Sequence, residues 1–83
     1  MPDATQDVHA DFAAIVQEVA DLPVEDIQPD KALRADLGVD SLSLVEIVVA
    51  TEERFGVRIP DEDAKQLRTV GDYVTYVERS RTT

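Results

Sequence analysis

The chain has 83 residues, no cysteine and a formal net charge of −10 at pH 7. This length predicts one small domain, and the lack of cysteine excludes disulfides and thiolate chemistry. The charge disfavours nucleic acid and anionic membranes as partners and favours proteins with basic patches. No apolar run approaches the ~20 residues of a membrane span. The acidic N-terminus is unlike a signal peptide, so we expect a cytoplasmic protein.

An amphipathic helix is predicted over about residues 5–20. Thr5 is a suitable N-cap, and Pro23 limits the far end. The apolar residues recur with the spacing of a single helical stripe. They are Val8, Phe12, Ile15, Val16 and Val19.

Regular periodicity fails from Asp21 to Asp40, where two prolines and scattered acids indicate a long connection. The pattern allows a short helical turn around residues 24–27. A loop of this length in a compact domain is usually functional or partly helical. Four apolar residues are spaced to anchor it, namely Leu22, Ile27, Leu33 and Leu37.

A second long helix is predicted over residues 41–55, ended by Gly56 as a left-handed terminator. A helical wheel separates its residues into two faces. The predicted core face is uncharged and consists of Leu44, Ile47, Val48, Thr51 and Phe55. The opposite face interleaves apolar residues and acids, namely Leu42, Val45, Glu46, Val49, Glu52 and Glu53.

Two further helices follow. Pro60 and three successive acids predict the start of a short helix at about 61–67. Thr69 and Asp72 form a capping pair for a helix over about 69–79. The fold class is therefore all-α, a single domain over residues 1–83. It is a four-helix bundle with three longer helices, one short helix and a long first connection.

The apolar residues on the outer side of the second helix allow two interpretations. In the first, the long connection covers Leu42, Val45 and Val49, so that the helix is buried nearly all round. In the second, these side chains form a docking surface whose apolar contacts supply affinity. The neighbouring glutamates then steer Arg and Lys side chains of a partner towards it.

Ser41 stands at the start of this helix, and its surroundings argue against catalysis. The only histidine is His9, at an expected exposed position, and no G-x-S-x-G elbow is present. Ser43 and Glu46 fit a capping box, whereas capping by Asp40 would leave the Ser41 hydroxyl facing solvent. Because a helix N-terminus favours an anion, Ser41 could carry a phosphate-linked group.

No metal site is predicted. The Asp36/Asp40 pair and the Asp61–Asp63 cluster lack the alternating ligands, central glycine and final glutamate of a calcium loop. With three glycines in the chain, a glycine-rich phosphate loop is also excluded.

The motifs resemble the acyl carrier protein family. The triplet Asp40-Ser41-Leu42 follows Asp36–Gly38 and precedes an apolar helix, which matches the family's attachment motif. The segments 52–63 and 67–77 match the rest of the pattern, so the resemblance covers nearly the whole chain. Asp-Ser-Leu alone is a weak signal, but its combination with length, acidity and the long first loop is specific.

This resemblance implies that Ser41, flanked by Asp40, carries 4′-phosphopantetheine added from coenzyme A by a phosphopantetheinyl transferase. The arm then holds acyl chains as thioesters. The carrier catalyses nothing, so it is not an enzyme, and it raises the local concentration of its substrate at each partner. The sequence of residues 39–63 resembles that of discrete actinobacterial carriers of type II fatty-acid synthesis. A polyketide carrier could have a very similar sequence.

The resemblance also implies partners and an interior site. The protein is expected to be a monomer, and its expected partners are ketosynthase, acyltransferase and ketoreductase enzymes. Basic patches on these enzymes would bind the outer face of the second helix. Five apolar residues could part around an acyl chain, namely Leu44, Val48, Phe55, Ile59 and Val74. Two alternatives stay open: an interaction module of the same fold that is never modified, and a carrier for an amino-acyl or peptidyl pathway. The aspartate before Ser41 favours the acyl class.

Overall fold

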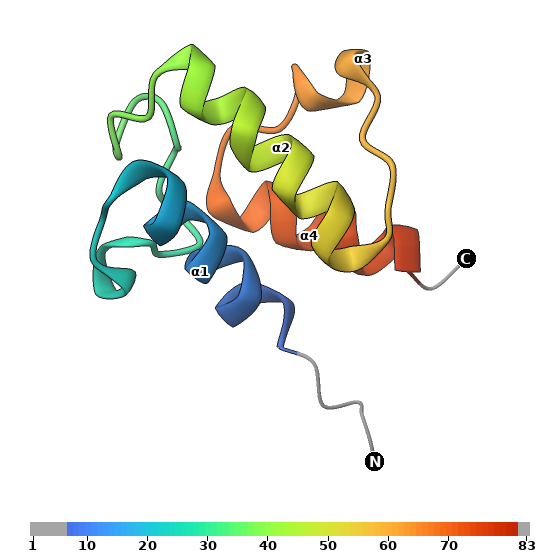
Figure 1. Ribbon diagram of the computed structural model, residues 1–83, viewed down its shortest axis with the longest axis horizontal. Coiled ribbons are helices and arrows are strands. Elements are labelled where there is room, and N and C mark those ends of the chain that lie inside the picture. The colour runs from blue at the N-terminus through green and yellow to red at the C-terminus, as the bar shows by residue number, and fades with distance from the viewer. Residues whose placement is uncertain (1–6, 82–83) are drawn as a thin grey trace.

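The computed structural model describes residues 7–81, and within this range it contains four α-helices and no strands (Figure 1). The helices are α1 (Val8–Ala20), α2 (Ser41–Phe55), α3 (Asp61–Ala64) and α4 (Val70–Arg81), and a 3₁₀ turn, η1 (Val24–Asp26), lies in the first connection. Three helices are long and one is short. The all-α fold class predicted from the sequence is therefore confirmed.

Aspartates flank helix α1 as caps at both ends. The Asp7 carboxylate accepts a hydrogen bond from the Ala10 amide at 3.2 Å, as an N-cap does. Thr5, the expected cap, lies outside the described residues. At the other end, Asp21 adopts a left-handed conformation with φ of 58°, and its amide donates to the Gln17 carbonyl. The helix therefore ends at Ala20, three residues before Pro23.

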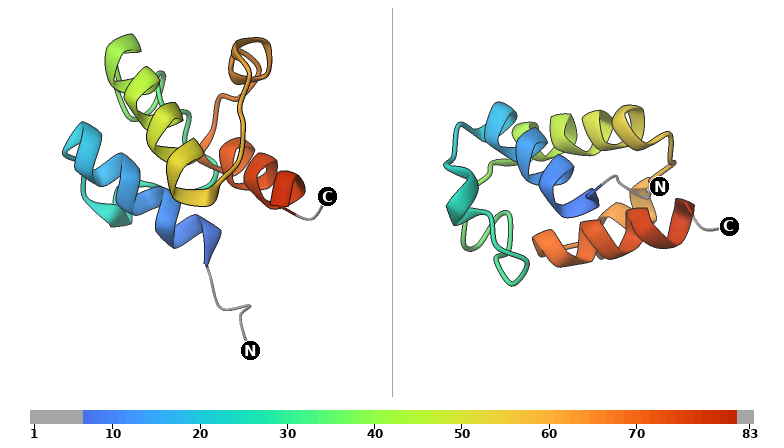
Figure 2. Two further views of the ribbon diagram at one scale, coloured as in Figure 1. Left: turned by 45° about the vertical axis from the view of Figure 1, so that its right-hand side comes forward. Right: turned by 90° about the horizontal axis from the view of Figure 1, so that it is seen from below.

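Helix α1 packs against both α2 and α4, whereas the backbones of α2 and α4 approach each other less closely (Figure 2). Phe12 and Val16 of α1 are fully buried. The Phe12 ring stacks on the Tyr73 ring of α4 with 5.2 Å between centroids. Stacked rings of this kind join burial of apolar area with a favourable ring geometry. Helix α1 is thus the central element of the core.

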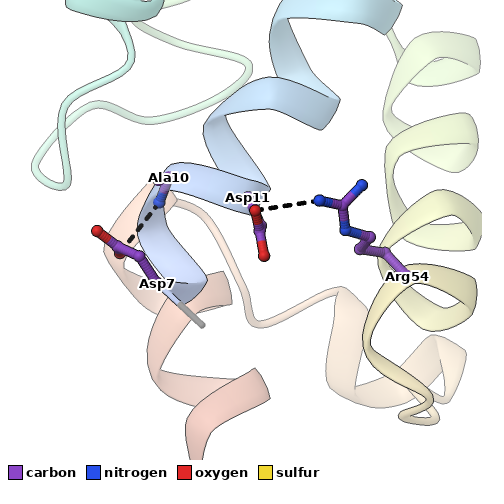
Figure 3. A network of polar contacts seen from close by, with 4 residues as sticks. All are labelled: Asp7, Ala10, Asp11 and Arg54. Carbon is purple, nitrogen blue, oxygen red and sulfur yellow. Dashed lines mark hydrogen bonds and ion pairs between the residues drawn. The ribbon is translucent and has the colours of Figure 1, made fainter. Parts of the chain in front are cut away.

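A polar contact relates the directions of α1 and α2. Arg54 in the last turn of α2 forms an ion pair at 3.1 Å with Asp11 in the first turn of α1 (Figure 3). The two helices therefore run antiparallel. The Arg54 side chain is 53% exposed, so this pair contributes at most about 1 kcal/mol.

The long first connection is fastened to the start of α4 by backbone hydrogen bonds. The amides of Val70 and Gly71 donate to the carbonyls of Lys31 and Pro29, each at 2.9 Å. These amides belong to the first turn of α4 and have no acceptor within the helix. A Cβ at Gly71 would stand 3.0 Å from the Pro29 carbonyl oxygen, so glycine permits the close approach.

Apolar side chains complete this anchoring. Ile27 and Leu33 are at most 1% exposed, and Val39 is also buried. Leu22 and Leu37 are half-buried against the same core. The connection therefore forms part of the core, which explains how a loop of this length is ordered.

The C-terminal helices differ slightly in extent from those predicted. Helix α3 ends at Ala64 rather than near residue 67, because the chain tightens there into a turn in which the Leu67 amide donates to the Ala64 carbonyl. The capping pair before α4 is confirmed. The Asp72 amide donates to the Thr69 hydroxyl at 3.0 Å, and the Thr69 amide donates to the Asp72 carboxylate at 3.1 Å.

Two side chains hold the segment between α2 and α3. The Glu52 carboxylate accepts from the Ile59 amide at 2.7 Å. The Tyr76 hydroxyl lies 2.8 Å from the Asp63 carboxylate and 3.2 Å from the Arg58 carbonyl oxygen.

Within residues 7–81, no helix has the length and apolar character needed to cross a bilayer. The same residues include no group of three potential metal-ligating side chains.

Candidate functional site

Asp40 is the N-cap of α2, and Ser41 is the first helical residue. The Asp40 carboxylate accepts a hydrogen bond from the Ser43 amide at 2.8 Å, and its carbonyl accepts from the Leu44 amide at 2.9 Å. The structure thus decides between the two capping arrangements that the sequence allowed. Ser43 is not the cap but the residue whose amide the cap satisfies, because helical geometry begins at Ser41.

Hydrogen bonds keep the Asp40 carboxylate charged. The Ser43 amide and, to a smaller extent, the Ser43 hydroxyl hold the pKa of Asp40 below its ordinary value of 3.8. The positive charge of Arg34 lowers the pKa further, while partial desolvation opposes these effects. A negative charge at an N-cap also interacts favourably with the helix dipole. At neutral pH the start of α2 is therefore stabilised by an ionised carboxylate beside Ser41.

The loop that precedes α2 determines the position of Ser41. Val39 is buried and its amide donates to the Leu33 carbonyl at 2.9 Å, which ties the loop to the core just before α2. Gly38 has φ of 71°, a left-handed conformation that glycine adopts without strain. The exposed Ser41 therefore follows closely on a segment anchored in the core.

His9 is badly placed to act on Ser41. It lies two residues before Asp11, whose partner Arg54 is in the last turn of α2. Ser41 is at the opposite end of this helix, about 20 Å away along its axis. His9 is also half-buried rather than exposed as expected, and its Nε2 atom is enclosed without a hydrogen-bond partner among residues 7–81.

The outer side of α2 is open to solvent. Leu42 is 73% exposed, Val45 59% and Val49 46%, so the long connection does not cover them. That first interpretation of the stripe is wrong, because the connection packs against α4 instead. Glu46 and Glu53 are exposed beside these side chains. We call Leu42, Val45, Glu46, Val49 and Glu53 the outer face of α2.

Glu52 differs from the other acids of this helix. Its carboxylate accepts the Ile59 amide, and its side chain is only partly exposed. A carboxylate held in this way fastens the segment after α2 and has less freedom to meet a partner. The structure therefore separates Glu52 from the outer face.

The five residues expected to surround an acyl chain do not share one cavity. Leu44, Val48 and Ile59 line a groove between α2 and α3, with a volume of about 560 Å³. Phe55 lies beside a different hollow, where the Arg81 guanidinium stands 6.0 Å from its ring. Val74 is half-buried against the core and is not part of the groove wall.

Tyr73 is a member of this groove that the sequence did not indicate as a site residue. Its position in the apolar stripe of the last helix marks it as core, and it is indeed fully buried. It also lines the groove, which only the packing of α4 behind α2 and α3 reveals. No sequence signal distinguishes such a tyrosine from an ordinary core residue.

Known proteins share this arrangement. A protein-family model described as "Phosphopantetheine attachment site" matches residues 10–77. The chain belongs to the acyl carrier protein family. An acyl carrier protein of Acidothermus cellulolyticus is 54% identical over 72 residues, which cover 87% of this chain and 86% of that protein. A meromycolate extension acyl carrier protein of Mycobacterium tuberculosis is 47% identical over 79 residues, covering 95% and 69%.

A solved structure agrees with this assignment. Rv0033 from Mycobacterium tuberculosis, provisionally named an acyl carrier protein, superposes with a TM-score of 0.82 at 30% identity. The superposition covers 88% of this chain and 97% of the other.

The chain is accordingly an acyl carrier and not a catalyst, and its cofactor is 4′-phosphopantetheine. Acyl carrier proteins work together with synthase enzymes. The residues present fit the cofactor, because Ser41 combines an exposed side chain with the first turn of a long helix. A phosphate held at Ser41 would lie near the first-turn amides of α2, which lack acceptors within the helix.

Proposed function

We propose that Ser41 is the attachment residue and that the chain carries acyl groups for fatty-acid or polyketide synthesis. The observation that carries this proposal is an exposed serine at the first position of α2, next to an ionised cap. When bound, the cofactor supplies a thiol that holds acyl chains as thioesters. The buried Val39 and the Asp40 cap anchor the chain next to the attachment point.

Attachment uses coenzyme A and a phosphopantetheinyl transferase. The Ser41 oxygen forms a bond to the phosphorus of the pantetheine phosphate, the pyrophosphate link of coenzyme A breaks, and 3′,5′-ADP leaves. The proton of the hydroxyl passes to a base of the transferase, because His9 lies beside the far end of α2. This division of labour agrees with a carrier that is itself no enzyme.

Within this proposal the outer face of α2 meets the partner enzymes, namely the transferase, ketosynthase, acyltransferase and ketoreductase. Exposed apolar side chains close to the attachment point support this role, as do the acids beside them. The relatives that extend meromycolate favour a fatty-acid pathway over a polyketide one. We further infer that the carrier acts as a monomer in the cytoplasm, as expected from its sequence.

Intact-mass measurement tests the attachment residue. The protein is incubated with coenzyme A and a promiscuous phosphopantetheinyl transferase. We expect one phosphopantetheine adduct on the wild type and none on Ser41→Ala. Ser43→Ala is the matched control, since it removes a hydroxyl two residues away and should still be modified.

An adduct that survives Ser41→Ala would contradict the choice of residue. A wild type that is never modified would instead support the alternative of a pure interaction module with this fold. The identity of the acyl group isolated on the native protein distinguishes an acyl carrier from one that serves an amino-acyl or peptidyl pathway.

A further inference from the structure

The hydroxyl of Tyr73 is buried and has no hydrogen-bond partner among residues 7–81. Its ring is fully buried in α4 and stacks on Phe12. About nine in ten buried polar groups in proteins are hydrogen-bonded, so an unpaired hydroxyl requires an explanation. Tyr76, one turn later, has the opposite character, since its hydroxyl contacts both Asp63 and Arg58.

Tyr73 also lines the groove between α2 and α3. The other walls of this groove include the apolar side chains of Leu44, Val48, Ile59 and Ala64. Charged side chains, namely Glu52, Arg58, Asp61 and Lys65, also line this groove. Tyr73 differs from them in that its hydroxyl is buried and unpaired. A water molecule or a ligand oxygen that reached the hydroxyl would end its unpaired state.

The groove begins close to the proposed attachment point. Leu44 follows Ser41 by three residues on α2, and Val48 lies about 10 Å from Ser41 along the helix axis. A chain tethered at Ser41 can therefore enter the groove between α2 and α3. The tether fixes one occupant for this groove, namely the acyl chain that the carrier itself holds.

The Tyr73 hydroxyl keeps its proton at neutral pH and can donate it to an oxygen of such a chain. Burial, and to a smaller extent the charge of Asp72, raise the pKa of Tyr73 above its ordinary value of 10.0. A hydrogen bond that this hydroxyl donates requires an acceptor oxygen on the chain. A saturated alkyl chain offers none, whereas the carbonyl of an oxoacyl chain does.

We propose that Tyr73 makes this carrier select acyl chains that bear an oxygen, oxoacyl chains above all, over fully saturated chains of the same length. This proposal rests on attachment at Ser41. The Tyr73 hydroxyl donates a hydrogen bond to the chain oxygen, while Leu44, Val48 and Ile59 contact the hydrocarbon part. A condensation step leaves such a carbonyl and a reduction step removes it, so the carrier favours chains between these two reactions.

The experiment uses the full-length protein loaded by a transferase with three stable amide analogues, carrying octanoyl, 3-oxooctanoyl and 5-oxooctanoyl chains. Thermal unfolding is measured for each loaded form. We expect at least one oxo chain to raise Tm above the octanoyl form by about 4–8 °C, the effect of one buried hydrogen bond in a domain of this size. In Tyr73→Phe this difference should vanish, because only the hydroxyl has been removed.

Tyr76→Phe is the matched control. It removes a hydroxyl from the same helix that is already bonded within the protein, so it should lower Tm in every form and leave the ranking of the chains unchanged. Nitrogen-15 NMR gives a second readout, in which the oxo chain should shift the Tyr73 amide more than octanoyl does.

Equal Tm values for octanoyl and both oxo chains in the wild type would overturn the proposal. So would an oxo preference that persists in Tyr73→Phe, because the hydroxyl would then not be its source. Failure of the transferase to load any analogue would instead overturn attachment at Ser41, and intact mass reports this separately.

Discussion

Asp40 and Asp72 each stabilise the start of a helix, α2 and α4 respectively. The Asp40 carboxylate accepts an amide of the first turn of α2, and the Asp72 carboxylate accepts two amides just before α4. These bonds lower the pKa of both groups below 3.8. For Asp72 the donors are the amides of Arg68 and Thr69. The residue type at each helix start was readable from the sequence, but the identity of the cap of α2 was not.

Asp72→Ala should lower the free energy of unfolding by about 1 kcal/mol at neutral pH, the usual loss for a helix cap. Because the pKa of Asp72 is lower in the folded chain, its stabilising effect is fully present above the unfolded value of 3.8 and is lost as pH falls through the folded value. The difference in Tm between wild type and variant should therefore shrink below pH 3.8. Thermal unfolding from pH 7 to pH 2.5 measures it.

Asp30→Ala is the control for this series, since it removes an exposed loop carboxylate and changes the net charge equally. Taking differences between variants cancels the general effect of acid on a highly charged chain. A gap between wild type and Asp72→Ala that is constant down to pH 2.5 would contradict a charge-dependent cap.

At the scale of elements, α2 shows most clearly how one helix serves two tasks. Ile47 and Thr51 are fully buried, and the Thr51 hydroxyl donates to the Ile47 carbonyl at 2.7 Å. Leu42 and Val45, on the other side, are more than half exposed. The helical period of 3.6 residues makes this division visible in the sequence. What covers each side is a property of the surrounding elements.

Charge reversal on the outer face of α2 tests its proposed docking role. Glu46→Lys and Glu53→Lys should weaken binding to a ketosynthase or to the transferase by roughly tenfold each at low salt, mainly through slower association. Far-ultraviolet circular dichroism should show unchanged helicity, since both side chains are exposed. Surface plasmon resonance at two salt concentrations measures the affinities and rates.

Glu25→Lys is the matched control, because it makes the same change of charge on an exposed acid of η1. Equal weakening by Glu25→Lys would point to net charge rather than to a docking face. Unchanged affinity for all three variants at low salt would count against steering by α2.

At the scale of the whole molecule, the charges are distributed unevenly. Residues 1–30 contain eight acids and no lysine or arginine, whereas residues 31–83 contain ten acids and eight bases. Close approach of like charges opposes the compact state, and a single exposed ion pair such as Asp11–Arg54 offsets little of it. The folded chain is therefore expected to be under electrostatic repulsion at neutral pH.

Salt should consequently stabilise the protein. Raising the ionic strength from about 0.01 M to 0.15 M shortens the Debye length from about 30 Å to about 8 Å. We expect Tm to rise by several degrees at pH 7 in sodium chloride, because repulsion among distant carboxylates is screened more than the short contacts are. A Tm that falls over this range would mean that attractive pairs dominate the electrostatics.

Local features of this carrier were decided by the sequence alone. Periodicity placed three long helices, Gly56 ended α2 in a left-handed conformation, and Thr69 with Asp72 formed the predicted reciprocal cap. The motif around Ser41 indicated the family. These features depend on residues within one or two helical turns, where backbone geometry and hydrogen bonding leave few choices.

Tertiary structure alone decided the features that depend on distant residues. The loop is fastened to α4 by backbone carbonyls, which carry no sequence signature, and this leaves Leu42 and Val45 exposed. The Glu52 carboxylate accepts a hydrogen bond from the Ile59 amide and so has a structural role. Tyr73 follows the pattern of a core residue, yet packing leaves its hydroxyl unpaired beside the groove. Burial and hydrogen-bond partners arise from contacts between elements, so the sequence pattern of one helix cannot contain them.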